Sequence, residues 1–170
     1  MKADELEAAL NGLVAELISS GAQDESLGEF VPARGFGPFA SAEKFRSLGR
    51  AWRLGVLLVD AEARLYSTGE LTRAIAPGRA AVNRSPLGER RRALRLAASR
   101  TFPKGEVVNF GYLEIDTSAE AVAAGSGPLS VEGDEVMVRL ESGAAGLAEL
   151  ERYLTNRVAL LEGGADEVFS

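Results

Sequence analysis

Two carboxylates, Glu114 and Asp116, have the residue types and spacing in this sequence that best suit acid/base or metal chemistry. They stand two positions apart near the end of an expected strand, and residues i and i+2 of a strand point to the same side. Paired carboxylates bind Mg²⁺ or divide the duties of general acid and general base. A strand end emerging into solvent explains the pair more simply, so both residues are weak catalytic candidates.

The sequence contains neither histidine nor cysteine. Nucleophilic systems of the Ser-His-Asp and Cys-His types therefore cannot be built from this chain, and neither can zinc sites of thiolates and imidazoles. Carboxylate chemistry, oxygen ligands for hard metals, or a hydroxyl with a lysine remain. We expect a protein without catalysis, metal or cofactor.

A second group of residues suits the binding of an anion. Basic residues are frequent in the middle of the chain, whereas both terminal helices and the tail are acidic. If the folded chain gathers these side chains in one concavity, a phosphate, a nucleotide or an acidic peptide could bind there. The candidate ligand-binding residues are Arg34, Arg53, Arg73, Arg91, Arg95, Asn109 and Tyr112.

Structural roles are the alternative for these candidates. Arg53 or Arg73 would pair with Glu70 across a hairpin, and Arg91 with Arg95 would belong to a solvated helix face. Asn109 and Tyr112 fall on a strand expected to be buried, where a polar side chain needs a hydrogen-bond partner. Neighbouring backbone supplies that partner in the structural interpretation, and a ligand supplies it in the functional one.

The stretch "ARGFGPFASAEKF", residues 33 to 45, also has two interpretations. Its Gly35-x-Gly37 is similar to a phosphate-binding loop, but it follows irregular chain and no "GK[ST]" occurs anywhere. The alternative is that the three phenylalanines bury their rings. Ordering the backbone costs about 1–2 kcal/mol per residue, and burial of aromatic rings offsets several residues' worth. We therefore favour rings that plug a core.

The overall charge limits the class of partner. The formal net charge is -6, which argues against nucleic acid and against an anionic membrane surface. No apolar run is long enough to span a bilayer, and Asp4, Glu5 and Glu7 interrupt any signal-peptide core. We expect a cytoplasmic protein. Only three of the 19 basic residues are lysines, a bias typical of a GC-rich bacterial genome.

Three helices follow from apolar periodicity and from end signals. The first covers residues 3 to 19, with Leu6, Leu10, Leu13, Val14, Leu17 and Ile18 on its buried stripe. The second begins after the N-cap Ser85 and ends before Pro103, with Leu87, Leu94, Ala97, Ala98 and Phe102 inward. The third covers about 144 to 162 and stops at Gly163-Gly164, before an acidic tail over 163–170.

Strands are expected in the remaining segments. Residues 52–59 and 65–71 alternate as a hairpin, in which Gly69 indicates a bulge or a close backbone approach. Residues 106–117 form an interior strand, 118–128 a helical turn or a loop, and 129–141 a second hairpin with its turn at "EGDE". The segment over 20–48 shows no period and is expected to be a long irregular connection.

The chain is therefore expected to be a single α+β domain over residues 1–170, in the order α-β-β-α-β-β-β-α. A mostly antiparallel sheet of about five strands with three main helices satisfies this order, which resembles that of profilin-like and roadblock/longin scaffolds. A non-catalytic interaction or assembly domain, most simply a homodimer, is the leading functional hypothesis. An anion-binding module that uses the central arginines and a small carboxylate-dependent hydrolase are the alternatives.

Overall fold

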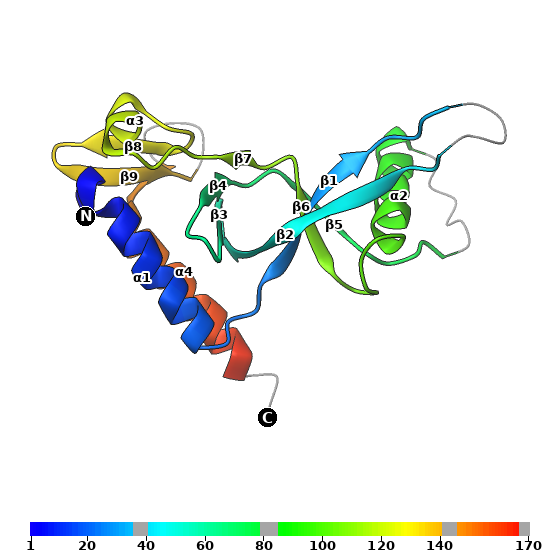
Figure 1. The fold of residues 1–170 in the computed structure, drawn as a ribbon, viewed down its shortest axis with the longest axis horizontal. Coiled ribbons are helices and arrows are strands. Elements are labelled where there is room, and N and C mark those ends of the chain that lie inside the picture. The colour runs from blue at the N-terminus through cyan, green and yellow to red at the C-terminus, as the bar shows by residue number, and fades with distance from the viewer. Residues whose placement is uncertain (36–40, 79–84, 141–145, 167–170) are drawn as a thin grey trace. The chain divides into compact units, whose positions relative to one another are not determined.

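The computed structural model describes residues 1–35, 41–78, 85–140 and 146–166 (Figure 1). The helices in these residues are the 3-10 helix η1 (Ala3–Glu5), α1 (Leu6–Ser19), α2 (Pro86–Ser99), α3 (Ala119–Ala124) and α4 (Leu150–Asp166). The strands are β1 (Glu25–Val31), β2 (Lys44–Leu54), β3 (Leu57–Asp60), β4 (Leu65–Ser67), β5 (Glu70–Arg73), β6 (Val107–Phe110), β7 (Leu113–Glu114), β8 (Leu129–Glu132), β9 (Glu135–Arg139) and β10 (Leu147–Glu149).

The strands form two sheets, and the α+β class with a mostly antiparallel sheet is confirmed. Seven strands pair in the order β5-β6-β1-β2-β3-β4-β7, and three pair in the order β10-β9-β8. The prediction of about five strands is wrong. Strands such as β4, β7 and β10 have only two or three residues, which is too short for apolar alternation to identify them.

The chain divides into two compact units. Unit 1 comprises residues 1–24, 51–68 and 113–170, and unit 2 comprises 25–50 and 69–112. Because each unit is assembled from segments that alternate along the chain, no linker marks the division in the sequence. The strand β2 contributes to both units, with its first seven residues in unit 2 and its last four in unit 1.

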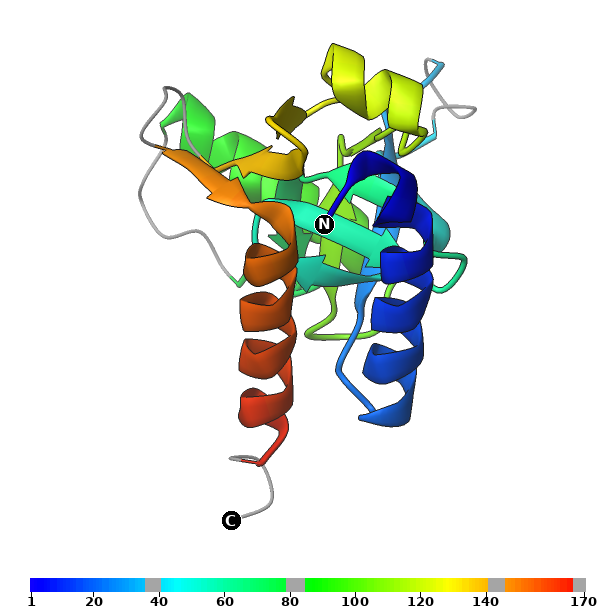
Figure 2. The ribbon, with the colours of Figure 1, turned by 90° about the vertical axis from the view of Figure 1, so that its left-hand side faces the viewer.

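In unit 1, α1 and α4 stand next to each other and share an apolar core with the short strands (Figure 2). The predicted stripe of α1 is buried at Leu6, Leu10, Leu13, Val14 and Leu17. The predicted burial of Ile18 is wrong, since its side chain is 59% exposed. The hairpin of β8 and β9 is confirmed, with Val131 opposite Val136.

The start and the end of the last helix differ from the prediction. Residues 147–149 form β10, whose Leu147 pairs with Arg139 of β9, so α4 begins only at Leu150. The glycines at 163 and 164 do not stop α4, which continues to Asp166. A helical glycine costs about 1 kcal/mol relative to alanine, so it weakens a helix end without forbidding it. The prediction of an acidic tail over 163–170 is therefore wrong for residues 163–166, which are helical. Residues 167–170 lie outside the described residues.

The predicted strand over 52–59 is a tight hairpin instead. Leu54 of β2 pairs with Leu57 of β3, and the turn between them uses Gly55 at φ +67°. The Tyr153 hydroxyl of α4 closes the turn, because it donates to the Leu54 carbonyl and accepts from the Val56 N–H, each at 2.9 Å. A Cβ at residue 55 would lie 2.2 Å from this hydroxyl, so the turn requires glycine.

In unit 2, the predicted irregular connection over 20–48 is wrong, because it contains β1 and the start of β2. Ser26 and Leu27 of β1 pair in parallel with Val108 and Asn109 of β6. The sequence pattern missed β1 partly because Gly28 interrupts its apolar residues. A Cβ at Gly28 would lie 2.8 Å from the Val108 side chain, so close strand packing selects the glycine.

Phenylalanine rings form the core of unit 2. Phe45 is 2% exposed and its ring centroid lies 5.3 to 6.4 Å from those of Phe30, Phe102 and Phe110. The predicted role of Phe45 as a core ring is therefore confirmed. The other two rings of that prediction, at 36 and 39, lie outside the described residues.

The helix α2 covers one side of this core. Its N-cap is confirmed, since the Ser85 Oγ accepts from the Gly88 N–H at 3.2 Å. The predicted inward residues Leu94, Ala97, Ala98 and Phe102 are buried. The predicted burial of Leu87 is wrong, because this residue lies in the first turn of α2 and is 56% exposed.

The predicted strand over 106–117 is divided at Gly111, which has φ +65°. Its first part, β6, is interior as predicted, whereas β7 is the terminal strand of the seven-stranded sheet. The expected close approach at Gly69 is confirmed, since a Cβ there would lie 2.3 Å from the Phe110 carbonyl oxygen.

Candidate functional site

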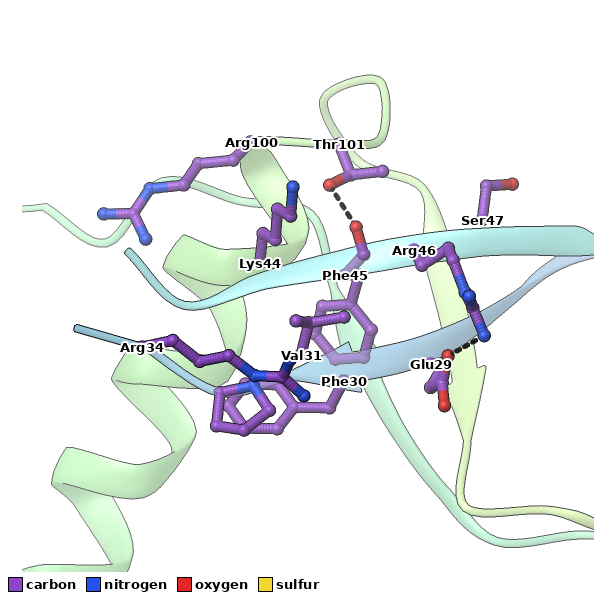
Figure 3. A pocket seen from close by; sticks show the side chains of 11 residues that line it. Glu29, Phe30, Val31, Arg34, Lys44, Phe45, Arg46, Ser47, Arg100 and Thr101 are labelled. Carbon is purple, nitrogen blue, oxygen red and sulfur yellow. Dashed lines mark hydrogen bonds and ion pairs between the residues drawn. The ribbon is translucent and has the colours of Figure 1, made fainter. Parts of the chain in front are cut away.

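A groove of about 930 Å³ opens on unit 2 (Figure 3). The end of β1, the start of β2 and the residues that follow α2 line it. Phe30, Val31, Pro32 and Phe45 give it an apolar base, and the edge-to-face pair of Phe30 and Phe45 fixes part of that base. Its size is that of a ligand site rather than of a packing defect.

Four basic side chains line this groove, which we call the basic groove: Arg34, Lys44, Arg46 and Arg100. Glu29 is the one carboxylate among its lining residues. Four cations against one carboxylate leave three positive charges in excess, although the chain as a whole carries -6. A local field of this sign attracts anions.

Two of the four cations are held in place by contacts within unit 2. Arg46 forms an ion pair with Glu29 across β1 and β2, and the Arg100 guanidinium donates to the Glu43 carbonyl. Next to Arg100, the Thr101 hydroxyl donates to the Phe45 carbonyl at 2.8 Å, which ties the end of α2 to the start of β2. These contacts position the wall of the basic groove without a ligand.

The other two cations, Arg34 and Lys44, form no ion pair with any residue in the described part of the chain. Both are exposed, and Figure 3 shows both side chains among the residues that line the groove. A backbone bridge between Arg34 and Ser41 holds the two chain segments that carry them side by side. Their charge is thus available to a bound anion.

Of the seven predicted ligand-binding residues, only Arg34 lines the basic groove. Arg91 and Arg95 are exposed on α2 and Arg73 is exposed on β5, outside the groove lining. Arg53 belongs to unit 1 and Tyr112 is half-buried in unit 2.

Asn109 has a structural partner. It is fully buried on β6, and its Nδ2 donates to the Glu25 carboxylate at 2.7 Å. A carboxylate on the neighbouring strand β1 therefore meets the need that the buried amide creates. The predicted pairing of Glu70 with Arg53 or Arg73 is replaced by a bidentate ion pair of Glu70 with Arg90 of α2, at 2.6 and 2.7 Å.

The paired carboxylates Glu114 and Asp116 lie in unit 1, and both are exposed. Glu114 is exposed on β7 opposite Tyr66. Asp116 accepts a hydrogen bond from the Ser118 N–H at 2.9 Å, and the hydrogen bonds from Ser118 hold the pKa of Asp116 below its ordinary value. A general acid at neutral pH needs a raised pKa, so this environment disfavours that role.

Lys44, Arg46 and Arg100 line the groove but are not among the ligand-binding residues predicted from the sequence. The sequence does contain a signal for Lys44 and Arg46, because both are next to Phe45. If Phe45 is buried and lies on a strand, its two neighbours point to the opposite face of that strand. Arg100 had no signal, because its place depends on where α2 ends against β2. In the described residues, no cluster of three or more carboxylates suits a metal ion.

No protein-family model, curated protein or solved structure matches this chain. Among the helices of the described residues, none has the length and apolarity needed to cross a membrane.

Proposed function

We propose that this protein is a non-catalytic binding protein whose basic groove holds an anionic ligand through phosphate or carboxylate groups. The observation that carries the proposal is the placement of four cations around one groove, with Arg34 and Lys44 left without an ion pair among the described residues. Hydrogen bonds between a cation and an anion contribute about 1.5–3 kcal/mol each. Two such contacts give a measurable affinity for a small anion.

Titration with inorganic pyrophosphate, followed by calorimetry and by thermal unfolding, tests this function. Wild-type protein should bind and be stabilised, and more weakly as salt is added, because salt screens exposed charges. The double variant Arg34→Ala/Lys44→Ala should lose at least about tenfold in affinity, which corresponds to about 1.4 kcal/mol.

The matched control is Arg91→Ala/Arg95→Ala, which removes the same charge from α2 outside the groove. It should bind pyrophosphate almost as wild type does. Equal losses in the two double variants would mean that net charge, and not the groove, governs binding. Absence of binding by pyrophosphate and by a tricarboxylate such as citrate would refute the function.

Self-association is the second candidate function, and an exposed leucine on an edge strand favours it. β5 ends the seven-stranded sheet, and Leu71 on it is 54% exposed. An edge of this kind is a template for pairing with another chain. Light scattering at micromolar concentration should give twice the mass of one chain, and Leu71→Lys should restore the monomer mass. No observation favours the hydrolase, since Ser118 already engages Asp116.

A further inference from the structure

The strand β2 has an open edge along its first part. It is eleven residues long, but β3 pairs only with its last four, from Ala51 to Leu54. On the opposite side β2 neighbours β1. Within the described residues, no strand therefore pairs with 44–50 on the side that β3 occupies further along.

The exposure pattern agrees with an open edge. Phe45 and Ala51 are buried, whereas all five residues between them are exposed, including Leu48 at 47%. Thr101 and Arg100 engage the carbonyls of Phe45 and Glu43, at the groove end. Ser47, Leu48 and Gly49, beyond that end, are exposed.

An open edge of this length suits an extended peptide. Unpaired N–H and C=O groups on a strand edge accept another strand, and main-chain hydrogen bonds then supply much of the affinity. Residues 46–50 at about 3.3 Å per residue present roughly 17 Å of edge. The basic groove includes Arg46 and Ser47, so the groove and the open edge share one strand without interruption.

Charge selects the peptide. Arg46 and Arg50 already pair with Glu29 and Glu106, so the open edge itself is close to neutral. The uncompensated charge lies at the groove end, on Arg34, Lys44 and Arg100. A bound strand would therefore place its own carboxylates at that end. A second copy of this edge would instead bring two sets of cations together, which is unfavourable.

We propose that the ligand of the basic groove is an acidic peptide segment, which adds as a strand to β2 along residues 46–50 and directs carboxylates toward Lys44 and Arg34. This inference rests on the proposed anion-binding function and specifies its ligand class. It also explains why five consecutive residues of a strand are exposed beside a groove with excess positive charge.

Four labelled peptides of about eight residues test the proposal by fluorescence anisotropy. One alternates Glu and Val, one alternates Lys and Val, and two are Glu/Val peptides N-methylated at alternate residues, one in each phase. The Glu/Val peptide should bind and the Lys/Val peptide should not. N-methylation in one of the two phases should weaken binding at least about tenfold, because it removes the N–H groups that pair with a strand.

Amide hydrogen exchange by NMR locates the peptide on the full chain. The Glu/Val peptide should slow exchange of amides within 46–50, and pyrophosphate should not. Arg34→Ala/Lys44→Ala should weaken peptide binding, whereas Arg91→Ala/Arg95→Ala should leave it unchanged.

The outcomes separate the two proposals. Binding of pyrophosphate without binding of the Glu/Val peptide would overturn the inference and leave the anion-binding function standing. Peptide binding that ignores N-methylation and protects no amide of β2 would also overturn the inference, since charge alone would then hold the peptide. If neither probe binds, both proposals fail.

Discussion

Removal of the Phe45 ring should destabilise the protein more than any other single truncation in unit 2. The ring is 2% exposed and contacts three other rings, from β1, from β6 and from the residues after α2. Truncation of a buried Phe to Ala costs about 3–5 kcal/mol, with the larger values where the cavity cannot collapse. Phe30 on β1 and Phe110 on β6 would line the cavity left by the Phe45 ring. The pairing of β1 with β6 holds these two residues in place, so the cavity cannot collapse freely.

We therefore expect Phe45→Ala to lose about 4 kcal/mol in the free energy of unfolding. Urea unfolding followed by circular dichroism measures this loss, with the denaturant slope compared between variants to check that the unfolding transition is the same. Leu48→Ala is the matched control on the same strand, because Leu48 is 47% exposed and should cost no more than about 0.5 kcal/mol. A loss below about 1 kcal/mol for Phe45→Ala, or equal losses in both variants, would refute the packing argument.

Two further predictions concern the turn at Gly55 and the pH dependence of stability. Gly55→Ala should cost about 1–3 kcal/mol in urea unfolding, because φ is +67° and the Cβ would meet the Tyr153 hydroxyl. Gly12→Ala, in α1 with no atom within 4 Å of a Cβ, should instead stabilise the protein by about 0.5–1 kcal/mol. If both substitutions changed the free energy of unfolding in the same direction, the special role of Gly55 in its turn would be contradicted. Hydrogen bonds from Arg90 lower the pKa of Glu70 below its ordinary 4.5, so the ion pair stabilises the fold above that pH and its contribution is lost as pH falls through the lowered value. Wild type should therefore exceed Glu70→Gln in melting temperature at pH 7, and the difference should shrink as the pH falls below the ordinary pKa of Glu70. A difference that grows toward low pH would contradict this sign.

The groove shows where sequence reasoning reached its limit. The basic middle of the chain predicts Arg34 as a ligand-binding residue, and Arg34 does line the groove. Arg91 and Arg95 carry the same charge at helical spacing, yet they are exposed on α2 and do not line the groove. The local sequence does not show whether an arginine on a helix lines a groove or lies on a solvated face. That difference depends on which other segment of the chain lies opposite the helix.

Glycine positions were informative in part. Gly69 was correctly associated with a close backbone approach, since a glycine inside a strand pattern has few other causes. The alternation of apolar residues over 52–59 predicts a strand through Gly55, although Gly55 forms a turn. The hydroxyl of Tyr153, almost a hundred residues away in the chain, decides that position.

The sequence by itself determined the α+β class, most of the buried faces of α1 and α2, the Ser85 cap and the exclusion of imidazole and thiol chemistry. These properties depend on local periodicity, on end signals and on which residue types exist. The tertiary structure alone decided the division into two units, the pairing of β1 with β6, the open edge of β2 and the set of cations around the basic groove. Each of these depends on contacts between segments far apart in the chain, whose pairing is set by the sum of many packing and hydrogen-bond energies and by no single stretch of residues.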